Sequence, residues 1–411
     1  MIMASAPSTP KAGWEVKTLG EVCEFARGLT YKKTDEVEQS SNAVLRANNV
    51  SLETKSLNFD EIKFIREDFK IPESKKVRNG SLLICTASGS KKHLGKVALI
   101  DADYSYAFGG FMGLLTPHEN ISSKYFFYSL TGKEYENFIA ELSDGANINN
   151  LKFSQLQEFR ITVPPLPEQE RIVGILDEAF GGIAAATAQA EKNLHNAREL
   201  FQSVLQSTFS QKGDDWVTCP LADLLELITY GFTNPMPTTD TGPYMVTAKN
   251  IREGRINYET TRHTSKEAFD ELLTKKSRPK IGDILLTKDG TLGRLAVVDR
   301  ENICVNQSVA VLRPNEKVEP NFLSLLLSSP SYQTRMIEDA GGTTIKHIYI
   351  TRVDKMEVAY PPAPNDRQAI VEKLDALSEE TKALEAIYER KQSALAELKQ
   401  SLLQKAFAGE L

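Results

Sequence analysis

Four polar loops in the first half of the sequence carry side chains that could bind a charged polymer. Lysine and arginine neutralise phosphates, while asparagine, glutamine and arginine form paired hydrogen bonds with the edges of bases. Each loop taken alone is equally consistent with a solvated turn. The candidate nucleic-acid-binding residues are Thr30, Tyr31, Lys32 and Lys33 in loop one (28–33), Asn48 and Asn49 in loop two, Lys91, Lys92 and His93 in loop three (88–93), and Asn147 and Asn149 in loop four (147–150), with Lys152 just after it.

The second half of the sequence has polar loops at equivalent places, but with different residues. Gly28-Leu29-Thr30, for example, aligns with Gly231-Phe232-Thr233. A duplicated scaffold with unlike loops is suited to reading two different sequences. The candidates are Thr233 in loop one (231–234), Lys249 and Asn250 in loop two, Lys288 and Thr291 in loop three (288–291) with Arg294 shortly after it, and Thr343, Thr344, Lys346 and His347 in loop four (343–347).

No group of residues has the spacing of a catalytic centre, so we expect no catalytic residue, no metal and no cofactor. The run Val163-Pro164-Pro165-Leu166 lacks the Asp or Asn and the aromatic residue with which adenine methyltransferases hold a flipped base. Asp177-Glu178 resembles a nucleotide-binding box, but the sequence has no phosphate loop of the G-x-x-x-x-G-K-[ST] type. The five histidines are scattered, and the four cysteines form no C-x-x-C pair.

Composition and charge describe an ordinary globular protein. The sequence is 41% hydrophobic and 25% charged, and its net charge of −6 counts mildly against a nucleic-acid partner. However, residues 1–165 hold 20 Lys+Arg against 20 Asp+Glu, and residues 216–363 hold 18 against 18. The acidic excess therefore lies outside these two blocks. No apolar run approaches the ~20 residues that span a bilayer, and we expect a cytoplasmic protein.

The loops are positioned by a tandem duplication with a period of about 200 residues. Leu94 to Asp101 matches Leu292 to Asp299, and the segment from Gly145 to Val163 matches the segment from Gly342 to Tyr360. A repeat of this length is a whole domain, not a small stacking motif.

Each repeat consists of a β-rich part followed by one long helix, which predicts an α/β (mixed α+β) fold. Apolar residues that recur every three to four positions predict two long helices, each of which packs on another helix. The predicted parts are a first domain (1–165), a central helix (166–212), a second domain (213–363) and a C-terminal helix (364–411). The residues expected in the helix packing are Ile172, Leu176, Ile183, Leu194, Phe201, Ile370, Leu374, Leu377, Leu384, Leu395 and Leu402.

This arrangement resembles the specificity subunits of type I restriction-modification systems. The resemblance rests on the segment from Ile161 to Ile172 and on the C-terminal run from Leu402 to Leu411, and it extends from Trp14 to the end of the chain. It implies two target recognition domains, each of which reads one half of a bipartite, asymmetric DNA target, and two long helices that pack as an antiparallel coiled coil. It also implies a non-catalytic subunit whose partners are double-stranded DNA, methyltransferase (modification) subunits and an endonuclease/translocase (restriction) subunit. The second copy departs from the motif at Asn365-Asp366-Arg367-Gln368.

Two other functions stay open on the sequence alone. A non-catalytic scaffold that binds protein partners through duplicated domains, with no sequence preference, fits the repeat and the neutral charge equally well. A fused enzyme with its own methyltransferase is disfavoured by the missing cofactor loop.

Overall fold

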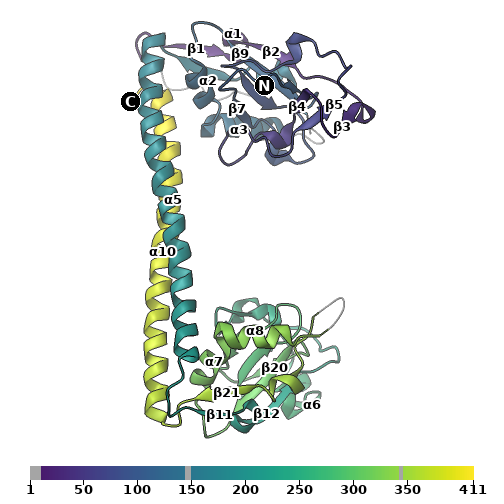
Figure 1. Cartoon of the computed structure of the whole chain (residues 1–411), viewed down its shortest axis with the longest axis vertical. Helices are drawn as coiled ribbons and strands as arrows, with labels where there is room; N and C mark the ends of the chain where they lie inside the picture. The colour runs from purple at the N-terminus through teal and green to yellow at the C-terminus, as the bar shows by residue number, and fades with distance from the viewer. Residues whose placement is uncertain (1–10, 144–149, 342–345) are drawn as a thin grey trace. The chain divides into compact units, whose positions relative to one another are not determined.

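The computed structural model describes residues 11–143, 150–341 and 346–411, and it divides into two compact units (Figure 1). Unit 1 combines the residues up to Ala190 with Arg390–Leu411, and unit 2 comprises Glu191–Glu389. Both units mix sheets with helices, so the expected fold class is confirmed.

Unit 1 is built around two four-stranded sheets. The first is antiparallel, in the order β2 (Cys23–Arg27), β9 (Met112–Pro117), β6 (Leu82–Cys85) and β7 (Val97–Leu99). The second has the order β3 (Glu36–Val37), β5 (Lys63–Ile65), β4 (Asn42–Leu45) and β8 (Ala107–Phe108), with β4 and β8 parallel. A separate pair joins β1 (Glu15–Thr18) to β10 (Arg160–Val163).

Unit 2 repeats this plan. Its antiparallel sheet has the order β12 (Leu225–Tyr230), β20 (Val309–Pro314), β17 (Ile284–Thr287) and β18 (Leu295–Val297). Its second sheet has the order β16 (Arg262–His263), β13 (Thr239–Val246) and β19 (Ile303–Val305), with β13 and β19 parallel. The remaining pairs are β11 (Val217–Pro220) with β21 (Glu357–Tyr360), and β14 (Ile251–Arg252) with β15 (Arg255–Ile256).

Short helices complete each unit. Those of unit 1 are α1 (Leu19–Val22), α2 (Ser123–Ser129), α3 (Lys133–Ser143) and α4 (Phe153–Leu156). Those of unit 2 are α6 (Lys266–Glu271), α7 (Pro320–Ser328), α8 (Pro330–Glu338) and α9 (Ile350–Val353). Single 3-10 turns follow β4 and β13, namely η2 (Ala47–Asn49) and η6 (Ala248–Asn250).

The central strand of each antiparallel sheet is buried on both faces. Leu82 and Ile84 of β6 lie in one apolar cluster with Phe126 of α2, whereas Leu83 and Cys85 lie in a second cluster with residues of β4 and β8. Side chains alternate between the faces of a strand, so a strand that separates two clusters is apolar at every position. The same alternation in β17 explains its sequence Ile284-Leu285-Leu286.

One buried polar pair differs between the units although its place in the fold is the same. In unit 2 the Asp283 carboxylate, 2% exposed, accepts two hydrogen bonds from the Arg313 guanidinium, at 2.8 and 2.7 Å. In unit 1 the equivalent residues are Ser81 and Thr116, whose hydroxyl oxygens lie 2.9 Å apart. At this position in the sheet, unit 2 therefore has an ion pair and unit 1 has a neutral hydrogen bond.

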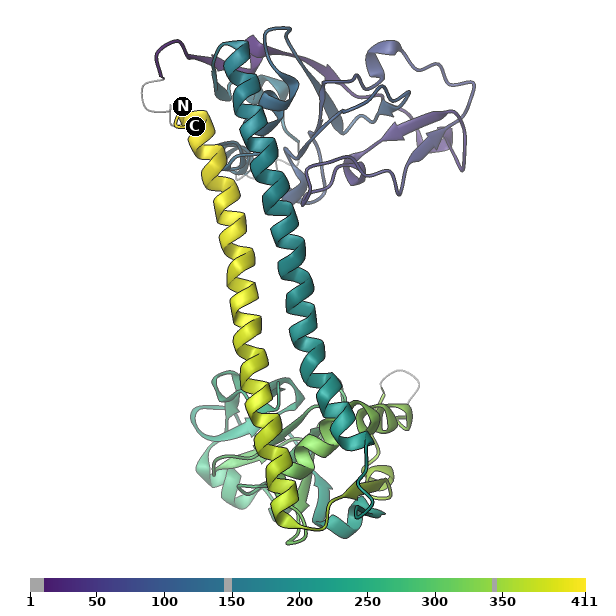
Figure 2. The same cartoon turned by 60° about the vertical axis from the view of Figure 1, so that its left-hand side comes forward.

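Two 45-residue helices, α5 (Leu166–Ser210) and α10 (Pro364–Ala408), each begin in one unit and end in the other. In unit 1 the start of α5 packs on the end of α10, where Ile172 and Leu176 share a cluster with Leu403. In unit 2 the end of α5 packs on the start of α10, where Phe209 shares a cluster with Leu374. Within each unit the two helix segments therefore run antiparallel, as the views in Figures 1 and 2 agree.

The expected helix-packing residues differ in how deeply they are buried. Leu384 is 39% exposed, so it contributes less to the helix packing than its spacing predicts. The others are buried or half-buried: Ile172, Leu176, Leu194 and Leu374 are buried, and Ile183, Phe201, Ile370, Leu377, Leu395 and Leu402 are half-buried.

A buried polar side chain fixes the start of each long helix to the domain before it. The Gln169 amide donates to the carbonyl oxygen of Pro164, 2.8 Å away, and accepts from the Ser122 N–H at the start of α2. In unit 2 the buried Arg367 donates to the carbonyl oxygen of Pro361 and pairs with Glu319 at the start of α7. Where the first copy uses the neutral Gln169 for this contact, the second copy uses the charged Arg367. This exchange accounts for the sequence difference between the two copies at the start of the long helices.

Replacing Arg367 with Ala is expected to destabilise unit 2 by roughly 2 to 4 kcal/mol, because buried carbonyl oxygens lose their donor. Arg367→Gln is the matched variant, since Gln169 makes the equivalent contact in unit 1. We expect Arg367→Gln to recover part of the loss in urea unfolding. Equal destabilisation by Gln and Ala would contradict the equivalence of the two contacts.

Candidate nucleic-acid interface

Loops from four parts of unit 1 meet at one turn, residues 109–111 between β8 and β9, which we call the central turn of unit 1. Loop one reaches it through the Leu29 N–H, which donates to the Phe108 carbonyl oxygen at 2.7 Å. The strand that leads into loop two reaches it through the Leu45 carbonyl oxygen, which accepts from the Gly109 N–H at 2.9 Å.

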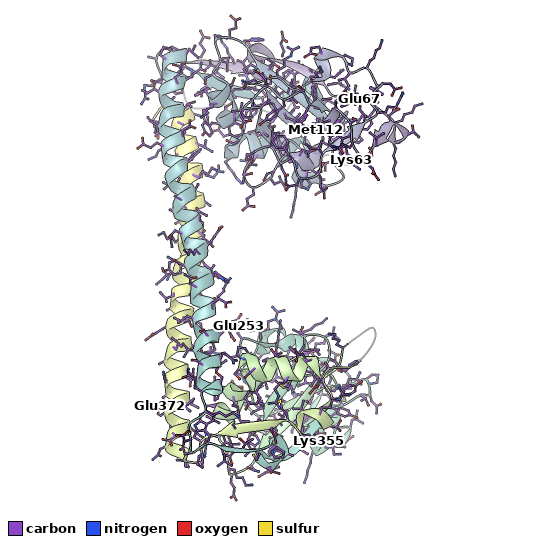
Figure 3. All side chains as sticks on the ribbon, viewed as in Figure 1. Lys63, Glu67, Met112, Glu253, Lys355 and Glu372 are labelled. Carbon is purple, nitrogen blue, oxygen red and sulfur yellow. The ribbon has the colours of Figure 1, made fainter. Side chains whose placement is uncertain are left out.

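Loops three and four complete this arrangement on the other side of the central turn. The N–H groups of Thr86 and Ala87 both donate to the Phe111 carbonyl oxygen, at 2.9 and 3.1 Å. The Thr86 carbonyl oxygen in turn accepts from the Leu151 N–H, directly after loop four. Met112, the first residue of β9, marks this region in Figure 3. Backbone hydrogen bonds therefore hold the residues at the ends of the four loops around one turn.

Unit 2 has the same set of hydrogen bonds around residues 306–308, the central turn of unit 2. The N–H groups of Lys288 and Asp289 donate to the Ser308 carbonyl oxygen, and the Phe232 N–H donates to the Val305 carbonyl oxygen. The Val246 carbonyl oxygen accepts from Asn306, and the Lys288 carbonyl oxygen accepts from Ile348. The repeat thus preserves the convergence of the loops while their sequences differ.

Loop one requires a glycine because its backbone lies against the central turn. A Cβ atom on Gly28 would lie 1.9 Å from the Gly109 carbonyl oxygen, and one on Gly231 would lie 1.8 Å from the Val305 carbonyl oxygen. Any larger residue would push loop one away from the turn. The glycine that opens loop one in both copies therefore has a structural reason.

Most of the candidate side chains that the structure describes are exposed to solvent. Tyr31, His93, Lys288 and His347 are half-buried. The exposed ones are Thr30, Lys32, Lys33, Asn48, Lys91, Lys92, Lys152, Thr233, Lys249, Thr291, Arg294 and Lys346. Asn147, Asn149, Thr343 and Thr344 lie outside the described residues.

Asn49 and Asn250 do not face a partner, contrary to the expectation from their loop positions. They are 1% and 4% exposed. The Asn49 amide accepts from the Arg46 N–H at 2.8 Å and donates to the Asn58 carbonyl oxygen at 2.9 Å. Asn250 makes the equivalent contacts with Thr247 and Thr260. A buried amide whose donor and acceptor are both used holds the loop backbone and is not available to a base.

Arg294 and Lys288 are also partly occupied within unit 2. The Arg294 guanidinium donates to the Ile251 carbonyl oxygen at 3.2 Å, in the place where the buried Lys96 of unit 1 donates to Val50. Lys288 pairs with Asp289, whose carboxylate also lies 2.6 Å from Nδ1 of His347. Arg294 and Lys288 therefore make contacts within unit 2 in addition to any contact they make with a partner.

The central turns themselves were not among the candidates expected from the sequence. Phe111, at 71%, has the most exposed large apolar side chain of the described chain, and Gln307 is exposed at the equivalent turn in unit 2. A finer self-alignment would have found both, because Met112-Gly113-Leu114-Leu115 matches Val309-Ala310-Val311-Leu312. The tripeptides just before this match, Gly109-Gly110-Phe111 and Asn306-Gln307-Ser308, differ in sequence and mark the two turns.

The features that resembled catalytic motifs have structural roles. The Asp177 carboxylate accepts from Lys124 Nζ at 2.6 Å and from the Tyr128 hydroxyl, and so fixes α2 to α5. Among the described residues, no group of three or more His, Cys, Asp and Glu could hold a metal ion. No helix in the described ranges is long and apolar enough to cross a membrane.

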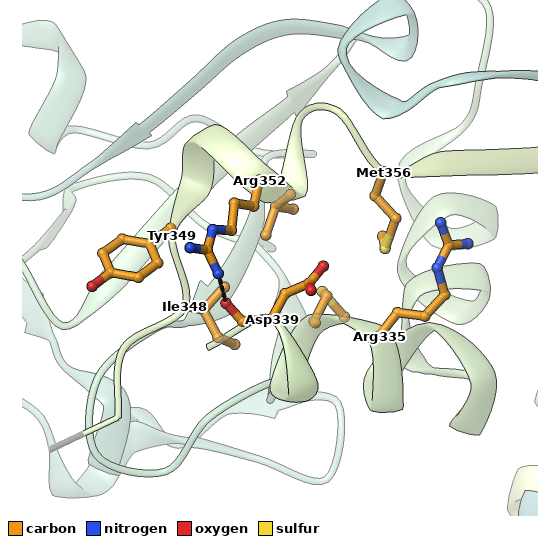
Figure 4. Close-up of a pocket in the computed structure, with 8 residues that line it drawn as sticks. Arg335, Asp339, Ile348, Tyr349, Arg352 and Met356 are labelled. Atoms are coloured by element: carbon orange, nitrogen blue, oxygen red, sulfur yellow. Dashed lines mark hydrogen bonds between the residues drawn. The ribbon is translucent and has the colours of Figure 1, made fainter. Parts of the chain in front are cut away.

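A small pocket in unit 2 lies between the end of α8 and α9 (Figure 4). Arg352 spans it and donates to the Asp339 carbonyl oxygen at 2.6 Å, while its guanidinium lies over the Tyr349 ring. Arg335 donates to the Glu357 carbonyl oxygen. The two guanidinium groups that line the pocket are thus used to join neighbouring elements, and we assign the pocket a structural role.

Comparisons with known proteins agree with the duplicated fold. A family model described as the type I restriction modification DNA specificity domain matches residues 11–194 and, a second time, residues 213–392. Among curated proteins, the chain is 24% identical over 428 residues to the EcoKI specificity subunit of Escherichia coli K12, covering 99% of this chain and 91% of that protein. It is 30% identical over 201 residues to the StySPI specificity subunit of Salmonella potsdam, covering 48% of this chain and 43% of that protein.

Solved structures share the fold at lower sequence identity. A chain from a study of complex assembly and conformational transition of the type I R-M system superposes with a TM-score of 0.81 at 18% identity, covering 98% of this chain and 100% of that one. The HsdS subunit from Thermoanaerobacter tengcongensis has a TM-score of 0.61 at 18% identity, with both chains fully covered.

Proposed function

Because this chain belongs to the type I restriction modification DNA specificity family, we propose that it is the subunit that selects the DNA sequence on which a type I complex acts. In this proposal unit 1 reads one half of a bipartite, asymmetric target and unit 2 reads the other half. The single observation that supports it best is the central turn, which is built by the same hydrogen bonds in both units but carries unlike residues. One scaffold with two different surfaces is what two different half-sites require.

The proposal includes partners that supply the chemistry. Methyltransferase subunits would dock beside the chain, and a restriction subunit would join for cleavage, while this subunit itself is non-catalytic and works in the cytoplasm. Residues 1–165 and 216–363 are neutral overall, so part of the charge that neutralises DNA phosphates would come from the partner subunits. The paired segments of α5 and α10 would set the gap between the half-sites, since a helix converts residue number into length.

Exchanging residues 14–163 for the corresponding domain of another family member is expected to change one half-site only. The reason is that the central turn of unit 2 uses no residue from that range. The measurement is sequencing of methylated positions in DNA modified by the chain assembled with its methyltransferase subunits. A change in both half-sites would contradict independent reading. A chain that protects no split site in footprinting would be a scaffold for protein partners instead.

A further inference from the structure

The central turns combine exposure with a fixed backbone, which distinguishes them from the loops around them. In unit 1 the backbone on both sides of Phe111 is held: the Gly109 N–H donates to Leu45, and the Phe111 carbonyl oxygen accepts two hydrogen bonds. The Phe111 side chain is nevertheless 71% exposed. Exposing a large aromatic ring to water is unfavourable by roughly 1.5 to 3 kcal/mol relative to burying it. A rigid backbone that presents such a ring is suited to a contact with a partner.

A second residue beside the same turn, Arg46, has one side-chain nitrogen without a hydrogen-bond acceptor. Side-chain carbon Cγ of Arg46 lies 3.6 Å from where a Cβ on Gly109 would stand. The Nε atom of Arg46 is buried and has no hydrogen-bond acceptor in the described structure. Buried donors normally find an acceptor, and a charged donor loses more free energy than a neutral one when it does not. The half-buried Arg46 thus places a guanidinium with an unused donor beside the exposed turn.

Unit 2 presents different chemistry at its own central turn. Gln307 is exposed at the middle of its central turn, and its own N–H is fixed by the Phe232 carbonyl oxygen at 2.8 Å. Position 46 corresponds to Thr247, whose hydroxyl already donates to Asn250. Gln307 aligns with Gly110, and Phe111 aligns with the half-buried Ser308, so the two turns project a side chain from neighbouring positions. Unit 1 presents an aromatic ring with a guanidinium beside it, and unit 2 presents a carboxamide without the guanidinium.

We infer that the central turns are specificity-determining elements that contact bases directly: Phe111 and Arg46 in the first half-site and Gln307 in the second. This inference rests on the proposed function. An apolar ring recognises the methyl group of thymine, a guanidinium pairs with guanine and a carboxamide pairs with adenine. The four loops around each turn would then hold the phosphates and bring the turn to the base edges.

The test uses the full chain assembled with its methyltransferase subunits and a library of duplexes that is randomised at the target. Phe111→Ala is expected to reduce discrimination at one position of the first half-site by roughly 5- to 150-fold and to leave the second unchanged. Gln307→Ala is expected to do the reverse. Leu272→Ala removes an apolar side chain that is 63% exposed in unit 2 outside the central turn, and it should change neither half-site.

Each outcome separates the inference from the proposed function. If the unaltered complex selects a split site and both turn variants keep its preference at every position, the central turns do not read bases. If Phe111→Ala weakens both half-sites equally, or prevents assembly with the methyltransferase subunits, the turn belongs to another interface and the inference is wrong. If the unaltered complex selects no split site, the proposed function itself fails.

Discussion

Replacing Asp283 with Ser is expected to lower the free energy of unfolding of unit 2 by roughly 3 to 5 kcal/mol. The reason is that the Arg313 guanidinium would keep its charge, with 20% of its side chain exposed, and lose both of its carboxylate acceptors. Trp216 packs beside Phe209 in the core of unit 2 and reports its unfolding. Urea unfolding followed by Trp216 fluorescence, in a chain with Trp14→Phe, measures the effect.

The double variant Asp283→Ser with Arg313→Thr is the matched control, because unit 1 uses Ser81 and Thr116 at these positions. Removing both charges together leaves no buried ion without a partner, so we expect the double variant to be more stable than Asp283→Ser alone. Coupling between the two substitutions is the quantity to report. If the double variant loses the sum of the two single losses, the hydroxyl pair does not replace the ion pair in this sheet.

Ending the chain after Gln400 is expected to unfold unit 1 and leave unit 2 folded. The removed segment contributes Leu402, Leu403, Ala406 and Phe407 to the cluster around Trp14 and Tyr125. With Leu411, four of the lost side chains are large and apolar; Leu403 is fully buried and the other three are half-buried. A fully buried side chain of this size is worth about 1.5 to 3 kcal/mol. The sum over the four side chains is comparable with the entire stability of an ordinary domain, about 5 to 15 kcal/mol.

Hydrogen exchange distinguishes the two units in this experiment. Amides of β6 in unit 1 should lose protection in the shortened chain, while amides of β17 in unit 2 should keep it, since Glu191–Glu389 form that unit. Gln404→Ala in the full-length chain is the control, because this side chain is exposed on the same helix turn. Retained protection of β6 in the shortened chain would contradict the role of the C-terminal segment.

The parts of the fold that could be predicted are those that local pattern determines. The repeat, both long helices and the strands at Leu82–Cys85 and Ile284–Thr287 follow from periodicity and self-similarity. The division of the chain into units could not be predicted in the same way. A stripe of apolar residues shows that a helix packs, but it does not show that Phe209 packs in unit 2 while Leu403 packs in unit 1.

The candidate interface residues stay a prediction. The structure has polar loops at equivalent points of both repeats, but loop composition does not distinguish a residue that holds the backbone from one that faces outward. Asn49 has the type and position of a base-reading residue and is fully used by its own loop. Phe111 has the type of a core residue and is exposed. Only the tertiary hydrogen bonds around the central turn separate these two cases.

Because unit 1 combines residues from both ends of the chain, the two units become complete in a fixed order during translation. Unit 2 has all of its residues once Glu389 has been added, whereas unit 1 waits for Arg390–Leu411. The domain whose strands are translated first is therefore the last to receive all of its residues. A product released early would carry a finished second half and an open first half, so only a fully translated chain can present both surfaces.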